Sequence, residues 1–259
     1  MKAAGRSPVR RDRAWAPLAL ALSTVAGLAL LAELAARLGL VSAFLLPPPS
    51  SVLASFAALV ESEALLSRAI ATAAAVVAAI SLAAVIGGAV GYALARHAVA
   101  RAAYRGWIVG LNATPSFLFY PLFLAIFGRS SATVVALGVL SSFPPVALLT
   151  CEGLLAIPVA LRNAGRNAGA RRWQLVWLVE LPAATPTILT GLRLGLIDAL
   201  VTVVGVEFLA AAGGLGGLIA DLGDRFNIRG TYGAILALIL LSALLQGLVG
   251  RLARRHGLR

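Results

Sequence analysis

The sequence contains very little lysine, cysteine or histidine. Its only lysine is Lys2, its only cysteine is Cys151, and its two histidines are His97 and His256. A single cysteine excludes an intrachain disulfide and any cysteine-rich metal site. With so few nitrogen and sulfur ligands, and scattered carboxylates, we expect no metal centre. Nor do two isolated histidines supply the nucleophile and base of an intramembrane enzyme. We therefore expect no catalytic residues.

The scarcity of lysine also bears on nucleotide chemistry. A phosphate-binding loop of the Walker A type needs a lysine that reaches the β- and γ-phosphates. Lys2 stands at the start of the sequence and lies in no glycine-rich loop of that kind. We expect no cofactor in this chain. If ATP drives its activity, a separate polypeptide binds ATP and magnesium and hydrolyses the nucleotide.

Charged residues are rare in general. They make up 12% of the 259 residues, whereas 60% of the residues are hydrophobic. The mean hydropathy is +0.94. A soluble domain is about one quarter charged, so this chain cannot cover its own surface for water. The composition predicts an all-α, polytopic membrane protein with the lipid bilayer as its solvent.

Long apolar segments predict about six membrane-spanning helices. A helix needs about 20 residues to cross the hydrocarbon core, within which every backbone polar group must be paired internally. The predicted spans are residues 14–38, 69–95, 108–128, 131–156, 186–211 and 230–251. We interpret the first as an uncleaved span, because it is long for a signal peptide. Pro115 and Pro121 suggest that only the second half of the third span is regular, and a short outer helix is expected at Val52–Ser67.

Basic residues alternate between the two sides of these spans. Sixteen lie in the tail at residues 1–13, after the second span, after the fourth span and in the C-terminal tail. Five lie in the intervening segments: Arg37, Arg68, Arg129, Arg225 and Arg229. The positive-inside rule then predicts that both termini are cytoplasmic. The net charge of +12 forms no continuous basic face, so no nucleic-acid partner is expected.

The longest predicted cytoplasmic loop, residues 157–185, has the pattern of two short helices. We expect these at Val159–Ala168 and Arg171–Glu180, with a left-handed turn at Gly169 and with Pro182 ending the second helix. Trp173 and Trp177 are four residues apart. Two interpretations follow from the residues alone. The helix pair lies at the lipid headgroups, or it docks a cytoplasmic partner.

Several motifs resemble a known family. The segments Asn163–Ala170, Trp173-Gln174 and Val179–Ala183 resemble the EAA loop of permease subunits of binding-protein-dependent ABC importers. Pro186–Arg193 and Glu207–Ile219 are similar to the nitrate/sulfonate/taurine branch of that family. The Pro47–Val52 turn and the Pro115/Pro121 segment fit as well, so the resemblance extends from about Leu46 over most of the chain.

The resemblance implies a type I ABC importer permease fold as one domain over residues 14–259. It implies a coupling helix that fits a groove of a cytoplasmic ATPase dimer, a second copy of this chain or a relative, and an extracytoplasmic solute-binding protein that meets the glycine run at 213–217. The family usually has glutamate at position 163 and alanine at 165, which puts the docking strength or the ATPase partner in question. The implied coupling residues are Asn163, Ala164, Gly165, Arg166, Gly169, Ala170, Trp173, Leu181 and Pro182.

Two acidic residues lie within the fifth predicted span. Asp198 and Glu207 are nine residues apart, which places them on opposite faces of a helix. A charge at this depth is costly, so each is expected to be neutral, paired or facing water. For Glu207 we favour lining or gating the outer pathway over a structural hydrogen bond, and for Asp198 we favour the structural interpretation. Pro115 is a further pathway candidate.

Three classes of function fit a chain of this kind. They are an ABC importer permease, an ion-driven secondary transporter and an intramembrane enzyme; the first is favoured because no internal repeat or catalytic constellation is visible. The family branch implies a bacterial cytoplasmic membrane protein that moves a small anion such as a sulfonate, taurine or nitrate. Related permeases carry vitamin precursors, which is the alternative.

Overall fold

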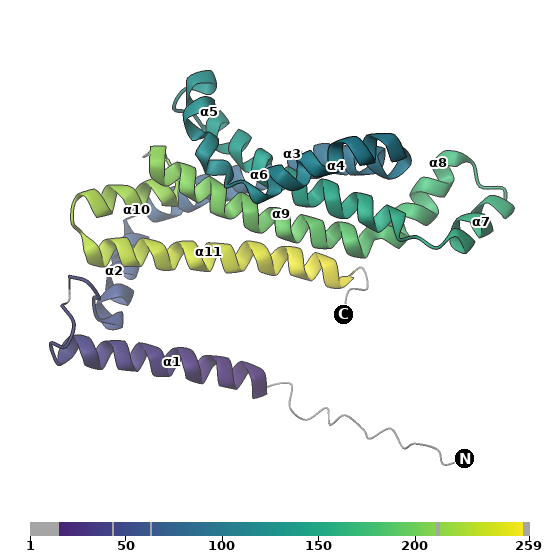
Figure 1. The fold of residues 1–259 in the computed structure, drawn as a ribbon. Helices are drawn as coiled ribbons and strands as arrows, with labels where there is room; N and C mark the ends of the chain where they lie inside the picture. The colour runs from purple at the N-terminus through teal and green to yellow at the C-terminus, as the bar shows by residue number, and fades with distance from the viewer. Residues whose placement is uncertain (1–15, 43, 63, 211–212, 256–259) are drawn as a thin grey trace, which may run out of the picture.

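The structure is a computed structural model that describes residues 16–42, 44–62, 64–210 and 213–255. The predicted tail at 1–13 lies outside these ranges. Within them all regular secondary structure is helical, which confirms the all-α class (Figure 1). The elements are α1 (Ala16–Arg37), α2 (Pro49–Glu61), α3 (Ala64–Arg96), α4 (Ala98–Ala113), the 3₁₀ turn η2 (Ser116–Phe119), α5 (Tyr120–Phe127), α6 (Ser131–Leu155), α7 (Val159–Asn167), α8 (Arg172–Leu175), the π-helical η3 (Val176–Glu180), α9 (Leu181–Ala210), α10 (Leu215–Asp224) and α11 (Ile228–Arg255).

Four described helices are individually long and apolar enough to cross a membrane. They are Ala19–Arg37, Leu65–Arg96, Ser131–Leu155 and Ile228–Arg251. Two bent pairs bring the number to six: Ala98–Ala113 with Ser116–Phe127, and Arg172–Ala210 with Leu215–Asp224. The observed helices therefore agree with the predicted count when each bent pair forms one span.

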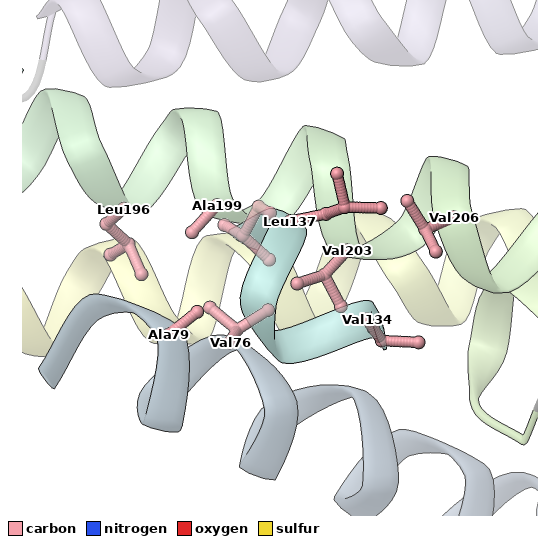
Figure 2. Close-up of a cluster of buried hydrophobic side chains, with 9 residues drawn as sticks. Val76, Ala79, Val134, Leu137, Leu196, Ala199, Val203 and Val206 are labelled. Atoms are coloured by element: carbon pink, nitrogen blue, oxygen red, sulfur yellow. The ribbon is translucent and has the colours of Figure 1, made fainter. Parts of the chain in front are cut away.

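The core of the bundle lies between α3, α6 and α9. Val76 and Ala79 of α3, Leu137 of α6, and Ala199 and Val203 of α9 are fully buried against one another (Figure 2). Small side chains let membrane helices approach closely. At Gly91 of α3 a Cβ atom would collide with the backbone of α6. The abundance of alanine and glycine in these segments is thus explained by close helix packing.

The third predicted span differs from its expected form. The longer regular helix is its first part, α4, and the chain then bends by 92° before α5. The bend occurs at Thr114, whose backbone is extended (φ −88°, ψ 126°). Proline disfavours the helical conformation of the residue before it, so Pro115 ends α4. The expectation that only the second half is regular is wrong.

Helix α2 also has different limits from the predicted Val52–Ser67. It begins at Pro49, since proline fits the first turn of a helix, and it ends at Glu61. Residues up to Ser67 belong instead to α3, which begins at Ala64 and has 33 residues. The second predicted span at 69–95 therefore lies within a longer helix, whose extra residues are mainly at its start.

Helix α1 lies apart from the three-helix core (Figure 1). It meets α2 through Glu33, whose carboxylate accepts hydrogen bonds from the backbone N–H of Ser50 at 3.0 Å and from its hydroxyl at 2.8 Å. Arg37 pairs with the same carboxylate at 2.7 Å. The start of α1 and the end of α11 point towards the end of the bundle that carries α7 and α8. We call this the α7 end, and the opposite end, with α2, α5 and α10, the α10 end.

Candidate functional site

Helix α7 lies beside α8, beyond the ends of the long helices of the bundle (Figure 1). Its C-terminus is closed by Gly169, whose φ of +76° is the left-handed conformation that glycine adopts most easily. The N–H of Gly169 donates to the carbonyl of Arg166 at 2.9 Å, and the N–H of Ala170 donates to Gly165 at 3.1 Å. This is the Schellman pattern that ends a helix and reverses the chain. The predicted turn at Gly169 is confirmed.

Gly165 is the point of closest approach between α7 and the segment that follows the turn. A Cβ atom at this position would lie 2.7 Å from Cδ1 of Leu175 and 3.2 Å from Cγ2 of Val179. Leu175 is buried beneath α7. Alanine, which the family resemblance leads one to expect here, would therefore require Leu175 to move. Glycine at 165 allows α7 to lie directly on α8 and η3.

The second helix of the loop does not end at Pro182. It passes through the π-helical segment η3 directly into α9, and the N–H of Leu181 bonds to the carbonyl of Val176, five residues earlier. Proline is tolerated in the first turn of an α-helix, where its missing N–H has no required partner. Pro182 occupies such a position after the change from π- to α-helical bonding. The expectation that Pro182 stops the helix is wrong.

Glu180 is the last residue of η3 and is 1% exposed. Its carboxylate contacts two arginines from different elements. Nε of Arg162, on α7, lies 3.2 Å from Oε1, and Arg96, at the end of α3, pairs with Oε2. The guanidinium of Arg96 also lies over the ring of Tyr92, with 4.9 Å to the ring centroid. Sequence reasoning missed this cluster, although Glu180 is the only acidic residue within 157–185.

The remaining predicted coupling residues lie on the outer surface of this end. Asn163, Ala164 and Arg166 are exposed on α7, and Trp173 on α8 is 59% exposed. A cavity of about 710 Å³ opens beside them. Its lining includes Tyr92, Arg96, His97, Arg166, Arg172 and Trp173. Of the predicted residues, Arg166, Ala170 and Trp173 line this cavity, while Leu181 and Pro182 lie in the first turn of α9.

Glu207 lies near the opposite end of α9 and is 2% exposed. Its carboxylate oxygens are 2.8 and 3.0 Å from the hydroxyl of Thr72, on α3. The N–H of Gly216, on α10, donates to Oε2 at 3.1 Å, and the N–H of Leu215 donates to the Thr72 hydroxyl at 2.8 Å. Glu207 and Thr72 together join α3, α9 and the start of α10. The hydrogen bonding that we had weighed as the structural alternative for Glu207 is present.

Helix α10 was missed in the glycine-rich segment. Gly214, with φ of +114°, makes the turn, but Gly216 and Gly217 are helical and buried. A Cβ atom at Gly216 would collide with the backbone of α9 at Val204 and Phe208. The glycines are therefore needed for close helix contact as well as for the turn. This is a tertiary requirement that the sequence pattern does not distinguish from a flexible loop.

A cavity of about 760 Å³ adjoins Glu207 at the α10 end. It is lined by α3, by the start of α6 and by the end of α9, and its charged residues are Arg129 and Glu207. Arg129 donates a hydrogen bond to the carbonyl of Ala210 near the end of α9. Glu207 therefore lines this cavity, although its carboxylate oxygens are hydrogen-bonded to Thr72 and Gly216. A gating role for Glu207 stays a prediction.

Asp198 and Pro115 are not part of either end cluster. Asp198 is half-buried near the middle of α9, and within the described residues its side chain has no hydrogen bond or ion pair. Its backbone carbonyl accepts a hydrogen bond from Ser141 at 3.2 Å. Pro115 is exposed at the bend between α4 and η2. No hydrogen bond or ion pair in the described part of the chain joins Pro115, Asp198 and Glu207.

The relatives found by comparison with known proteins are permease proteins of transport systems. The taurine transport system permease protein TauC of Escherichia coli strain K12 is 28% identical over 247 residues, covering 92% of this chain and 90% of its own. The riboflavin transport system permease protein RibX of Chloroflexus aurantiacus is 31% identical, covering 82% and 79%. The glycine betaine/proline betaine permease ProW of E. coli K12 is 32% identical over 74% of this chain, which spans 55% of ProW.

The fold matches a solved membrane transporter. A chain of the MetNI methionine ABC transporter in an inward-facing conformation superposes with a TM-score of 0.65 and 24% identity, covering 75% of this chain and 97% of its own. This confirms the predicted type I importer permease fold. The family model described as "binding-protein-dependent transport system inner membrane component" matches residues 83–257, which include the core helices α6 and α9, the α7 surface and both glutamates. The chain therefore belongs to the family of inner membrane components of binding-protein-dependent transport systems.

Proposed function

We propose that this chain forms the membrane pathway of an ATP-driven solute importer and that α7 is its coupling helix. The observation that carries the proposal is the exposed α7 surface, which a Schellman turn and the contact at Gly165 hold against α8 and η3, the segment that continues into α9. A helix in this position can pass a displacement from a docked partner to a helix of the core.

The proposed orientation places the α7 end in the cytoplasm. The loops that meet there, together with the two tails, carry sixteen of the 22 basic residues. The partner at this end is a dimer of cytoplasmic ATPase subunits, which binds ATP and magnesium. A solute-binding protein meets the α10 end. Two copies of this chain enclose the pathway, which fits the exposed apolar face of α9 that includes Leu194, Val201 and Phe208.

The proposed mechanism is alternating access. Closure of the ATPase dimer on ATP displaces α7, and the displacement passes through η3 into α9. Because α9 packs against α3 and α6 throughout the core, its movement reorients these helices together. Interfaces of close-packed helices change between discrete arrangements rather than deforming continuously, which suits a pathway that opens at one end at a time.

The proposed solute is a small organic or inorganic anion such as a sulfonate, taurine or nitrate. The similarity to TauC over most of both chains supports this class. The alternative is a vitamin or vitamin precursor, supported by the similarity to RibX. Selection of the solute is assigned mainly to the binding protein. An ion-driven secondary transporter is the remaining alternative, and the experiment below separates it from the importer.

The test is affinity purification of the tagged full chain from native membranes, followed by identification of the co-purifying proteins. We expect an ATPase with a Walker A motif, and we expect Ala164→Glu on α7 to abolish its recovery. Glu61→Arg, a charge change at an exposed position of the α10 end, is the matched control and should leave recovery unchanged. A chain that purifies alone and transports solute in liposomes without ATP would overturn the proposal.

A further inference from the structure

Glu180 is placed where a carboxylate is costly. It is 1% exposed, on a segment that leads into the apolar helix α9. A buried carboxylate requires paired charge and satisfied hydrogen bonds. Arg96 donates a hydrogen bond to one carboxylate oxygen of Glu180, and Arg162 forms an ion pair with the other at 3.2 Å without a hydrogen bond. Two guanidinium groups therefore neutralise one carboxylate.

The two arginines come from opposite sides of the junction. Arg162 belongs to α7, and its Nη2 also donates a hydrogen bond to the carbonyl of Leu154 near the end of α6. Arg96 is the last residue of α3. Glu180 itself is joined to the first residue of α9. A single buried carboxylate thus connects the exposed helix α7 with the ends of all three core helices.

The backbone at Glu180 is also unusual. The residues Val176–Glu180 form a π-helical turn, which is rare and is frequently found at functional sites. A π turn contains one more residue than an α turn, so its side chains point in directions that a regular helix would not give. Here the turn places Glu180 beneath α7, while Trp177, three residues earlier, is 66% exposed. The backbone geometry is thereby matched to the two arginines.

Stability alone is a poor explanation of this arrangement. Replacing a buried ion pair by well-packed apolar side chains is often neutral or stabilising. A buried ion pair instead favours one geometry, because an arrangement that leaves either charge unpaired in the interior is costly. Helix α7 otherwise contacts the bundle through the apolar packing at Gly165. The ionic contacts fix the angle and position of α7 against the core in a way that packing at one glycine cannot.

We propose that Glu180, Arg96 and Arg162 form a transmission joint, in which they act as positioning residues that make α7 move as one body with the inner ends of α3, α6 and α9. The inference deepens the proposed function and rests on it. Without the joint, α7 still presents its docking surface to the ATPase, but its displacement is absorbed at the loop instead of reaching α9. ATP hydrolysis and movement of the pathway then become uncoupled.

The test uses the complex of the full chain with its co-purified ATPase in liposomes, and it needs no knowledge of the solute. A reporter cysteine is introduced by Val201→Cys, at an exposed position in the middle of α9, in a Cys151→Ser background. Its labelling rate with a water-soluble maleimide is measured without nucleotide and after trapping with ATP and vanadate. Phosphate release and ATPase recovery are measured on the same preparation.

With Glu180 intact, we expect trapping to change the labelling rate at least about fivefold, the lower range of allosteric couplings. Glu180→Gln should abolish this change while ATPase recovery and phosphate release persist. Glu152→Gln is the matched control, because Glu152 also pairs with an arginine, Arg105 at 2.8 Å, but on the surface. It should keep the full change. Arg162→Met combined with Glu180→Gln should be no worse than the more severe single variant, since both remove the same contact.

The outcomes separate the joint from the proposed function. A Glu180→Gln complex that keeps the nucleotide-dependent change overturns the joint. One that no longer retains the ATPase also overturns it, because Glu180 would then belong to docking or folding. If the chain with Glu180 intact shows no change in labelling although its ATPase is bound and active, the proposed coupling through α7 fails instead.

Discussion

A buried glutamate lies directly before the start of α9 and another lies near its end, and the two differ in the charge of their partners. Glu180 at the α7 end is 1% exposed and pairs with two arginines, whereas Glu207 at the α10 end is 2% exposed and is bonded to a hydroxyl and a backbone N–H. They are 27 residues apart, which corresponds to about 40 Å along a helix. The same residue type therefore has charged partners at one end and neutral partners at the other.

The difference between the charged partners of Glu180 and the neutral partners of Glu207 follows from the access of water to those partners. Arg96 and Arg162 retain 35% and 24% of their side-chain exposure, so their guanidinium groups reach both water and Glu180. The partners of Glu207 are Thr72 and the first residues of α10, which are buried among helices. Short, uncharged donors suit an apolar interior, because no further charge has to be removed from water. We infer that ionic contacts stabilise the site at Glu180 and that hydrogen-bond geometry stabilises the site at Glu207.

The largest effect on stability is expected when Glu180 loses both of its arginine partners. Arg96→Ala combined with Arg162→Ala leaves Glu180 buried without a partner, which should lower the free energy of unfolding by about 3–5 kcal/mol. Thermal unfolding of the detergent-solubilised chain measures this loss. Arg105→Ala is the control, since its pair with Glu152 is about half exposed. Equal losses in the two variants would contradict the importance of burial at Glu180.

The next effect concerns the fit of α10 against α9. Gly216→Ala places a methyl group against the backbone of α9 on two sides, where neither neighbour is a flexible side chain. We expect a loss of about 3 kcal/mol, at the upper end for overpacking, in the same unfolding assay. Gly223→Ala, on the same helix, has open space around the new Cβ and should be neutral or slightly stabilising. A tolerated Gly216→Ala would show that α10 is free to shift.

The third prediction separates the contribution of the negative charge of Glu207 from that of its hydrogen bonds. Glu207→Gln keeps a carbonyl oxygen for Gly216 N–H and the Thr72 hydroxyl, so we expect nearly unchanged stability. Glu207→Ala removes every acceptor and should lose about 2 kcal/mol, because a buried N–H is left unpaired. Thermal unfolding of both variants tests this order. If Gln were as damaging as Ala, the negative charge itself would be required and the contrast with Glu180 would disappear.

The smallest effect is expected at an ion pair on the surface of the α10 end. Arg68 and Asp221 join α3 to α10 at 3.3 Å, and both side chains are about one third exposed. Arg68→Ala should lower stability by less than about 1 kcal/mol, because exposed ion pairs are screened by water. Repeating the unfolding measurement at high salt provides the control, since salt should remove the remaining difference. A loss as large as that at Glu180 would show that ion pairs at both ends are equivalent.

Part of this architecture could be predicted from local signals. Apolar runs and alternating basic residues predicted helices at the observed positions of α1, α3, α6, α9 and α11, and Gly169 predicted the turn after α7. Each of these signals lies within a few consecutive residues. The regular part of the third predicted span and the path through Pro182 were predicted wrongly, because a proline can end a helix or begin its first turn and the surrounding bonding decides between them.

The functional clusters could not be predicted in the same way. Thr72 and Glu207 are 135 residues apart, and Arg96 and Glu180 are 84 apart. Glu180 carried one weak signal, as the only acid in a basic loop, whereas Thr72 carried none. The pattern of a glycine-rich loop concealed α10, because glycine is chosen there for close packing, which depends on the neighbouring helix.

The sequence by itself determined that this chain is a membrane protein of about six helical spans and that it resembles an importer permease. Hydrophobicity and charge act on each segment independently of the others, so they can be read along the chain. Only the tertiary structure decided which buried charges meet, that α7 is joined to the core through Glu180, and that α10 is locked to α9 through Glu207. These contacts depend on helices brought together from distant parts of the chain, whose side chains select one another by distance and direction.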